Sequence, residues 1–163
     1  MSRLRSKTCC FTGHRDIPVG EQKQICKRAE GVIRQLYDRG VRYYGVGGAI
    51  GFDTMMAQLL MDLRSRDLPD IKIILVKPFD GFTSKWSELQ KQQYELLLPQ
   101  YNKVVCVAEY PSRQAYLNRN RHLVNGSAYC VAYCTRNEGG SAYTVNLAKQ
   151  NGLIVFNLAD SRC

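Results

Sequence analysis

Gly45-Val46-Gly47-Gly48-Ala49-Ile50-Gly51-Phe52-Asp53-Thr54 is the stretch of sequence that decides the fold. It follows a short apolar segment at 43–46 and leads into apolar residues at helical spacing, which predicts a turn between a strand and a helix. Glycines let such a turn approach a ligand closely, and the helix N-terminus that follows favours an anion. The stretch therefore indicates a site for a phosphorylated or nucleotide-like ligand.

The spacing of these glycines excludes two stricter motifs. A Walker phosphate loop ends in Gly-Lys-Ser/Thr, and a dinucleotide fingerprint reads Gly-x-Gly-x-x-Gly. After Gly45 and Gly47, Ile50 stands where the third glycine of the fingerprint belongs, and the next glycine is Gly51. The alternative interpretation is a glycine-rich turn that only permits close packing of a helix on the sheet.

Composition predicts one folded, cytoplasmic domain. The chain has 163 residues, of which 45% are hydrophobic, and this suits a single domain over 1–163 with a buried core. Lys and Arg number 23 against 14 Asp and Glu, and the net charge of +9 is compatible with nucleotides, polyphosphate or nucleic acid. The basic N-terminal run is followed by too few apolar residues for a signal peptide or a membrane span.

Cysteine and histidine usage favours reduced thiols without a metal. The seven cysteines are an odd count without a paired Cys-x-x-Cys, and most of them fall in or beside predicted strands. This pattern is typical of buried, reduced side chains. His14 and His122 are the two histidines, so we expect no metal site.

Two kinds of apolar segment alternate along the chain. Short runs predict six strands, at 8–11, 41–46, 71–76, 103–108, 129–133 and 153–158. Segments with helical spacing separate them, at 21–38, 55–63, 86–97, 116–127 and 141–150. This order predicts an α/β fold, a Rossmann-like three-layer sandwich with a mainly parallel sheet of about six strands. Ligands of such sheets lie at the carboxyl ends of the strands, so the loops after strands one, two, four and five should converge on one edge.

Basic side chains near these loops are candidates for phosphate binding. Arg15 shortly follows the first strand and offers a planar guanidinium fork, and His14 beside it is a candidate for ligand binding or proton transfer. Arg119 and Arg121 lie two apart, which on a helix sends them in nearly opposite directions. Arg121 falls in an apolar stripe, so we expect it to face the pocket and Arg119 to be solvated.

A third glycine-bearing turn repeats the pattern of strand, turn and helix. It reads Glu138-Gly139-Gly140-Ser141, with Thr144 one turn further on. Ser141 is either a helix N-cap or a phosphate ligand, and Asp53 is either an N-cap or a carboxylate that binds ribose hydroxyls. Glu138 and Asp53 are the candidates for an acid or base if the protein is an enzyme.

With these residues in view, the sequence resembles the YpsA-like branch of the SLOG superfamily, Rossmann-like proteins related to DNA-processing protein A and to the Lonely Guy phosphoribohydrolases. The resemblance rests on Cys10-Phe11-Thr12-Gly13-His14-Arg15 with Pro18, on 47–53 with Ala57, on Pro78, Trp86 and Arg119-Asn120-Arg121, and on 139–144. It implies a pocket for a nucleotide or an ADP-ribose- or NAD-like ligand. The ligand-binding set is then Gly13, His14, Arg15, Gly47, Gly48, Ala49, Gly51, Asp53, Pro78, Arg119, Arg121, Gly139, Gly140, Ser141 and Thr144.

Two departures from related proteins bear on catalysis. The Lonely Guy hydrolases carry Pro-Gly-Gly-x-Gly-Thr-x-x-Glu with a catalytic glutamate, whereas 138–145 lacks that downstream acid. Asn125 stands where the resemblance leads us to expect an acid after the arginine segment. We therefore favour a cytosolic sensor or carrier for a nucleotide-derived ligand over a nucleotide N-glycosidic hydrolase, and we lean against an enzyme.

Single-stranded nucleic acid is the third hypothesis, which we rank below a small-molecule partner. The charge of +9 and the related DNA-processing fold suggest it, and tyrosines beside a basic groove would supply the stacking surface. No membrane partner is expected. Apolar residues in excess of one core also allow a homodimer or a higher homo-oligomer.

Overall fold

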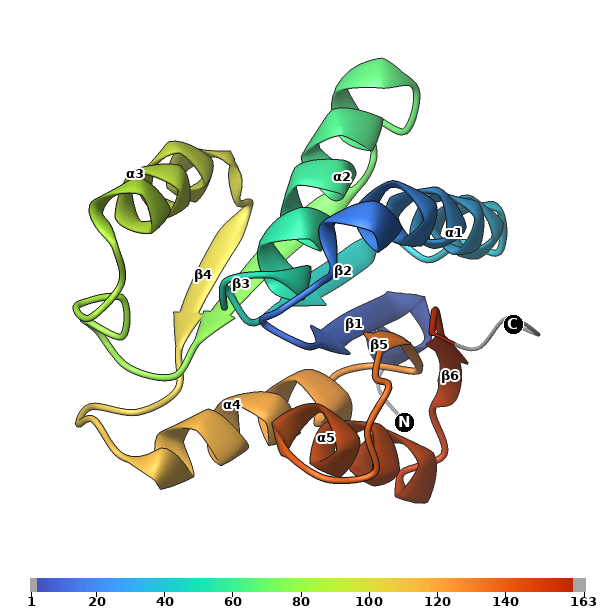
Figure 1. The fold of residues 1–163 in the computed structure, drawn as a ribbon. Coiled ribbons are helices and arrows are strands. Elements are labelled where there is room, and N and C mark those ends of the chain that lie inside the picture. The colour runs from blue at the N-terminus through green and yellow to red at the C-terminus, as the bar shows by residue number, and fades with distance from the viewer. Residues whose placement is uncertain (1–2, 160–163) are drawn as a thin grey trace.

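Six parallel strands form the centre of the computed structural model, which describes residues 3–159 (Figure 1). The strands are β1 (Thr8–Gly13), β2 (Tyr43–Val46), β3 (Lys72–Lys77), β4 (Lys103–Cys106), β5 (Tyr129–Tyr133) and β6 (Ile154–Asn157). The helices are α1 (Val19–Asp38), α2 (Phe52–Arg66), α3 (Glu88–Leu97), α4 (Arg113–Asn125) and α5 (Gly140–Gln150), with short 3-10 turns at Arg5–Lys7 and Leu98–Gln100. The strand order is β4-β3-β2-β1-β5-β6.

Helices cover both faces of this sheet. Figure 1 shows α1, α2 and α3 on one face and α4 and α5 on the other. The larger core cluster lies under α1 and α2 and includes the fully buried Tyr44 and Ile73. A second cluster, under α4 and α5, includes Cys10, Cys130 and Val145. Burial on both faces explains the near-continuous apolar strands, and the predicted α/β Rossmann-like fold is confirmed.

The strand order creates a switch point beside β1. From β1 the chain steps outward through β2 and β3 to β4, and α4 then carries it back to β5 on the other side of β1. The loops that follow β1 and β5 therefore leave the sheet toward opposite faces. Parallel sheets form their ligand crevices where the strand order reverses in this way, outside the carboxyl ends of the strands.

Two helix starts differ from the prediction because polar side chains cap them. The Ser112 hydroxyl accepts the Ala115 N–H at 3.0 Å, so α4 begins at Arg113 rather than near residue 116. A capping box between Ser87 and Gln90 starts α3 at Glu88. Trp86, which we predicted in this helix, therefore lies in the loop before it.

The cysteines within residues 3–159 are free thiols, and Cys163 lies outside the described part of the chain. Three of them, Cys9, Cys10 and Cys130, are buried in the sheet. Within the same residues we find no helix with the length and apolar character needed to cross a membrane. The described residues also contain no cluster of three or more side chains suited to a metal ion.

Candidate functional site

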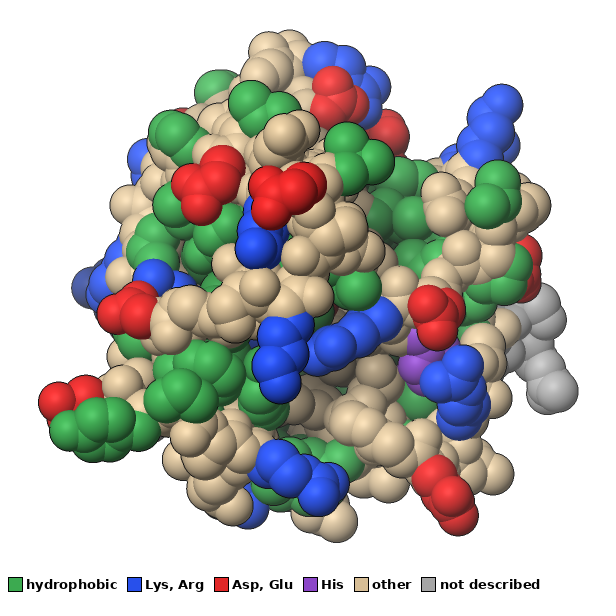
Figure 2. Space-filling model, turned by 60° about the vertical axis from the view of Figure 1, so that its left-hand side comes forward, with side chains coloured by type: hydrophobic (Ala, Val, Ile, Leu, Met, Phe, Trp, Pro, Cys, Tyr) green, Lys and Arg blue, Asp and Glu red, His purple; other side chains and the backbone are tan. Residues whose placement is uncertain are grey.

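The loops that follow β1, β2 and β5 meet at the carboxyl edge of the sheet, where the topology predicts a site. They enclose a hollow of about 390 Å³, which we call the central cleft. Figure 2 looks onto this edge, and Lys and Arg side chains gather around a hollow there. The predicted site residues that line the central cleft are Gly13, His14, Arg15, Ala49, Asp53, Arg119, Glu138, Gly139, Gly140 and Ser141.

Other predicted residues lie outside the central cleft. The Thr144 hydroxyl donates to the Gly140 carbonyl at 2.9 Å and is buried against α5 itself. Arg121 is exposed and donates to the Tyr143 hydroxyl at 3.0 Å. Pro78 is buried just after β3. The remaining members of this group are Gly47, Gly48 and Gly51, which pack against the protein's own atoms.

Close packing requires glycine at several positions of the loop after β2. A Cβ on Gly51, whose φ is +82°, would overlap the Arg15 carbonyl oxygen. A Cβ on Gly47 would lie 2.7 Å from a guanidinium nitrogen of Arg119 and 2.9 Å from a carboxylate oxygen of Asp53. The glycines thus let the loop after β1 dock on the start of α2, where Phe52 N–H donates to the His14 carbonyl at 3.1 Å. The packing interpretation of this loop is correct for Gly47 and Gly51, and the loop positions Arg15.

Arg119, not Arg121, is the arginine that faces inward, so our preference for Arg121 was wrong. Only 7% of Arg119 is exposed, and its guanidinium donates to the Gly47 carbonyl and, at 2.7 Å, to the Asn120 side chain. The buried stripe of α4 is Ala115, Arg119 and Leu123, four residues apart. That spacing is visible in the sequence, and recognising the Ser112 cap would have selected it. Burial lowers the pKa of Arg119.

Asp53 is a buried carboxylate beside Arg119. Its Oδ2 accepts the Ala49 N–H at 3.2 Å, and its Oδ1 is buried without a hydrogen-bond partner among the described residues. Burial raises the pKa of Asp53, and the nearby charge of Arg119 opposes that shift. Neither residue belongs to an ion pair within residues 3–159. Gly51 is the N-cap of α2, so of our two alternatives for Asp53 the N-cap was wrong.

His14 ties the loop after β1 to the loop after β5. Its Nε2 accepts the Thr135 N–H at 2.9 Å, which places the proton of the neutral ring on Nδ1. The ring also meets the edge of Tyr133, with centroids 5.5 Å apart. Burial first, and then the positive charge of Arg136, lowers the pKa of His14. This arrangement fits a neutral, positioning side chain better than an acid or base.

The start of α5 is open toward the central cleft. Its N-cap is Gly139, which makes no side-chain capping bond, so our alternative of Ser141 as N-cap was wrong. A Cβ on Gly140 would meet no atom within 4 Å. The first backbone N–H groups of an α-helix have no intrahelical partner. The residues that open α5, Gly140 and Ser141, line the same cleft as Arg15 and Arg136, and neither arginine forms an ion pair within the described part of the chain.

A second hollow, of about 640 Å³, adjoins the central cleft, and sequence reasoning missed it. We call it the aromatic cleft, because Phe79, Phe82, Trp86 and Tyr116 line it. Phe79 and Tyr116 meet edge to face with centroids 5.4 Å apart, as do Phe82 and Trp86. The two clefts share Arg15, Ala49, Tyr116 and Arg119. Phe79, Phe82 and Trp86 lie close together in the segment after β3, whereas Tyr116 comes from α4, so the sequence does not indicate that the four meet.

Comparison with known proteins agrees with this architecture. The family model YpsA, described as the YspA SLOG family, matches residues 9–153. A UPF0398 protein of Bacillus velezensis is 27% identical over 154 residues, covering 88% of this chain and 84% of that protein. The UPF0398 protein YpsA of Bacillus subtilis is 25% identical over 154 residues, covering 88% of this chain and 85% of that protein.

Two solved structures share the fold. DNA processing protein A from Streptococcus pneumoniae matches 94% of this chain with a TM-score of 0.66 and 17% identity. The Helicobacter pylori protein of the same name, described by its single-stranded DNA binding mode, matches 94% of this chain with a TM-score of 0.64 and 17% identity. This chain spans 50% of the first structure and 66% of the second.

Proposed function

The chain belongs to the YpsA SLOG family, and on that premise we propose that it binds a nucleotide or nucleotide-derived ligand, as a sensor or carrier, at the carboxyl edge of its sheet. The observation that carries the proposal is the open start of α5, which lines the central cleft together with two arginines that form no ion pair within residues 3–159. The proposal concerns binding without turnover.

The phosphates are placed in the central cleft. Free N–H groups and the positive end of the helix dipole favour an anion at the start of α5. Arg15 and Arg136 are both exposed and line this cleft, so each can add a charge-assisted hydrogen bond to a phosphate oxygen. The absence of a side chain on Gly140 leaves room for the phosphate to reach the backbone.

The base is placed in the aromatic cleft. Tyr116 lies in the walls of both clefts. A base bound beside Tyr116 and a phosphate bound at the start of α5 can therefore belong to the same nucleotide. Aromatic rings accept a base by stacking, which is worth about 1–3 kcal/mol per base. Phe79, Phe82 and Trp86 supply the remaining apolar wall.

Asp53 and Glu138 are not assigned to catalysis in this proposal. The unpartnered oxygen of Asp53 is closed off from solvent, so a ribose hydroxyl or an attacking water cannot reach it in this conformation. Its other oxygen holds the Ala49 N–H. Asp53 therefore acts as a positioning residue for the loop after β2. Glu138 lies exposed on the rim, with no hydrogen-bond or ion-pair partner within residues 3–159 that would orient it.

A substitution at Gly140 tests the phosphate site without disturbing the fold. Gly140→Glu adds a carboxylate in open space at the first turn of α5, where an acidic side chain favours the helix by about 0.3–1 kcal/mol. The same carboxylate repels a phosphate. We expect isothermal titration with AMP, ADP, ADP-ribose and NAD to show binding of at least one of them. Gly140→Glu and Arg15→Ala should each raise the Kd of that nucleotide about tenfold, or ~1.4 kcal/mol.

Arg121→Ala is the matched control, because Arg121 is exposed on α4 and lies outside the clefts. The Kd of Arg121→Ala for the bound nucleotide should stay within about twofold of the Kd of the unsubstituted protein. The proposal is overturned if none of the four nucleotides binds, or if a nucleotide binds equally to the unsubstituted protein, to Gly140→Glu and to Arg15→Ala.

Single-stranded DNA is a second candidate ligand for the same edge. The Helicobacter pylori structure of this fold is described by its single-stranded DNA binding mode, and this chain carries a net charge of +9. Tyr110 and Tyr143 are exposed at 72% and 37% and offer stacking surfaces. Fluorescence anisotropy with a labelled oligothymidine tests this candidate. Binding must weaken steeply with added salt, because phosphate contacts release counterions, and salt-independent binding contradicts it.

A further inference from the structure

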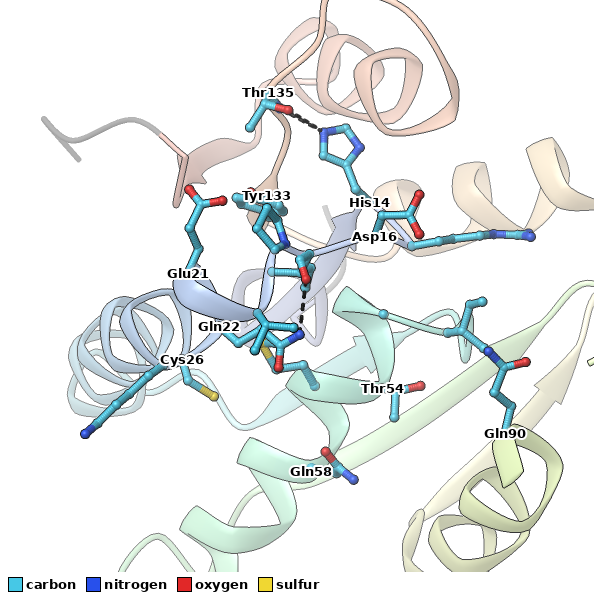
Figure 3. A pocket seen from close by; sticks show the side chains of 18 of the residues that line it. His14, Asp16, Glu21, Gln22, Cys26, Thr54, Gln58, Gln90, Tyr133 and Thr135 are labelled. Carbon is cyan, nitrogen blue, oxygen red and sulfur yellow. Dashed lines mark hydrogen bonds between the residues drawn. The ribbon is translucent and has the colours of Figure 1, made fainter. Parts of the chain in front are cut away.

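A third hollow, of about 1020 Å³, lies on the other side of the loop after β1 from the central cleft. Figure 3 shows Gln22 and Cys26 entering it from α1, Thr54 and Gln58 from α2, and Gln90 from the start of α3. His14 and Asp16 stand at its rim, on the loop that the central cleft also uses. Of the residues on the helical walls of this hollow, our sequence analysis named Thr54, as the end of the glycine-rich stretch.

Four amide side chains line this hollow, which we call the amide cleft, and charged side chains line it as well, namely Arg15, Asp16, Glu21, Lys23 and Arg136. Gln22, Gln58, Gln90 and Gln93 all line it, together with the hydroxyl of Thr54. Gln22 donates to the Ile17 carbonyl at 3.1 Å and Gln90 accepts the Ser87 N–H at 3.0 Å, so each of these two keeps one polar group free. A primary amide both donates and accepts hydrogen bonds. The amides of this wall suit an uncharged group of mixed donors and acceptors, such as a base edge or a sugar.

Arg15 stands where the three clefts meet. It is the one residue that lines the central, aromatic and amide clefts together, among residues 3–159. The close approach of Gly51 fixes the backbone of Arg15. The Arg15 side chain is exposed and forms no ion pair with a described residue. Trp86 and Gln90 form a wall shared by the aromatic and amide clefts. A phosphate on Arg15 therefore has a nucleoside-sized hollow on either side.

We propose that the ligand is a dinucleotide, with its bridging phosphates at Arg15, one nucleoside in the aromatic cleft and the second nucleoside in the amide cleft. This inference rests on the proposed function and names the class of its ligand. A pocket of about 300–1,000 Å³ encloses a whole drug-sized ligand. The aromatic and amide clefts, at about 640 and 1020 Å³, each reach that range, so a mononucleotide leaves one of them empty.

ADP and NAD are the matched pair of probes. They share adenosine and a pyrophosphate, and NAD adds a second nucleoside. We expect isothermal titration to show NAD bound at least about tenfold more tightly than ADP. The double substitution Gln58→Ala with Gln93→Ala removes two exposed amides of the amide cleft. It should raise the Kd for NAD about tenfold and change the Kd for ADP by less than about twofold.

Gln92→Ala is the control, because Gln92 is an exposed neighbour on α3 that does not line the amide cleft. Its Kd for NAD should not change. The inference is overturned, while the proposed function stands, if ADP and NAD bind equally or if the double substitution leaves NAD binding unchanged. If neither ligand binds and AMP and ADP-ribose also fail, the proposed function falls and this inference falls with it.

Discussion

Replacing Gly51 with alanine should loosen the contact between the loop after β1 and the start of α2. Gly51 has φ +82° and ψ −121°, a backbone conformation that side chains disfavour. An alanine Cβ there would overlap the carbonyl of Arg15, which is backbone and cannot rotate away. The substitution therefore strains the backbone and pushes the loop that carries Arg15.

Two costs add in this variant. A non-glycine residue in so sparsely populated a backbone region costs about 1–3 kcal/mol. Relieving the overlap by moving a packed loop costs about 1–3 kcal/mol more. The expected loss is therefore ~2–6 kcal/mol, a large fraction of the ~5–15 kcal/mol typical of a folded protein. A loss of ~1 kcal/mol lowers the melting temperature of a chain of this size by roughly 2–4 °C.

Urea unfolding followed by circular dichroism measures this loss. Gly31→Ala is the control, because Gly31 lies exposed within α1, without positive φ and with no atom near an added Cβ. It should stabilise the protein by about 0.5–1 kcal/mol, since glycine weakens a helix interior. If Gly51→Ala unfolds within about 0.5 kcal/mol of the unsubstituted protein, the packing account of this glycine is refuted.

Three further expectations follow from the buried polar groups. Arg119→Ala should lower the free energy of unfolding in urea by about 2–4 kcal/mol, because the Gly47 carbonyl loses its hydrogen-bond donor. Arg121→Ala should change it by less than about 0.5 kcal/mol, because Arg121 is exposed. Equal losses in the two variants contradict the assignment of Arg119 as the inward-facing arginine. Burial raises the pKa of Asp53 above its ordinary 3.8, so the folded state retains a proton that the unfolded state releases, and stability falls as pH rises from 3.8 toward the folded pKa. Asp53→Asn should remove that fall, so its unfolding free energy relative to the unsubstituted protein should rise with pH, and a parallel pair of curves contradicts the shift. Burial lowers the pKa of His14 below 6.5, so the contribution of His14 to stability is complete above pH 6.5 and is lost as pH falls through the folded pKa. NMR titration should place the midpoint of His14 below 6.5. A midpoint at or above 6.5 contradicts the lowered pKa.

The sequence by itself determined the layers of the fold and the edge that carries the cleft. Short apolar runs alternate with helical spacing, and that order requires a parallel sheet covered on both faces. Because parallel strands end at one edge, residues after β1, β2 and β5 had to meet, and Arg15, Asp53 and Gly140 do line one cleft. These inferences are local or topological, so they need no knowledge of side-chain packing.

Only the tertiary structure decided which residue of each motif faces inward. A hydroxyl cap at Ser112 starts α4 three residues before the predicted boundary and places Arg119 in the buried stripe. The glycine loop resembles a phosphate cradle in sequence, yet Gly51 contacts Arg15, a residue 36 positions earlier, and no local rule encodes that approach. The amide cleft is likewise built from three helices. Such contacts join distant parts of the chain, and their geometry depends on the packing of the whole sheet and its helices.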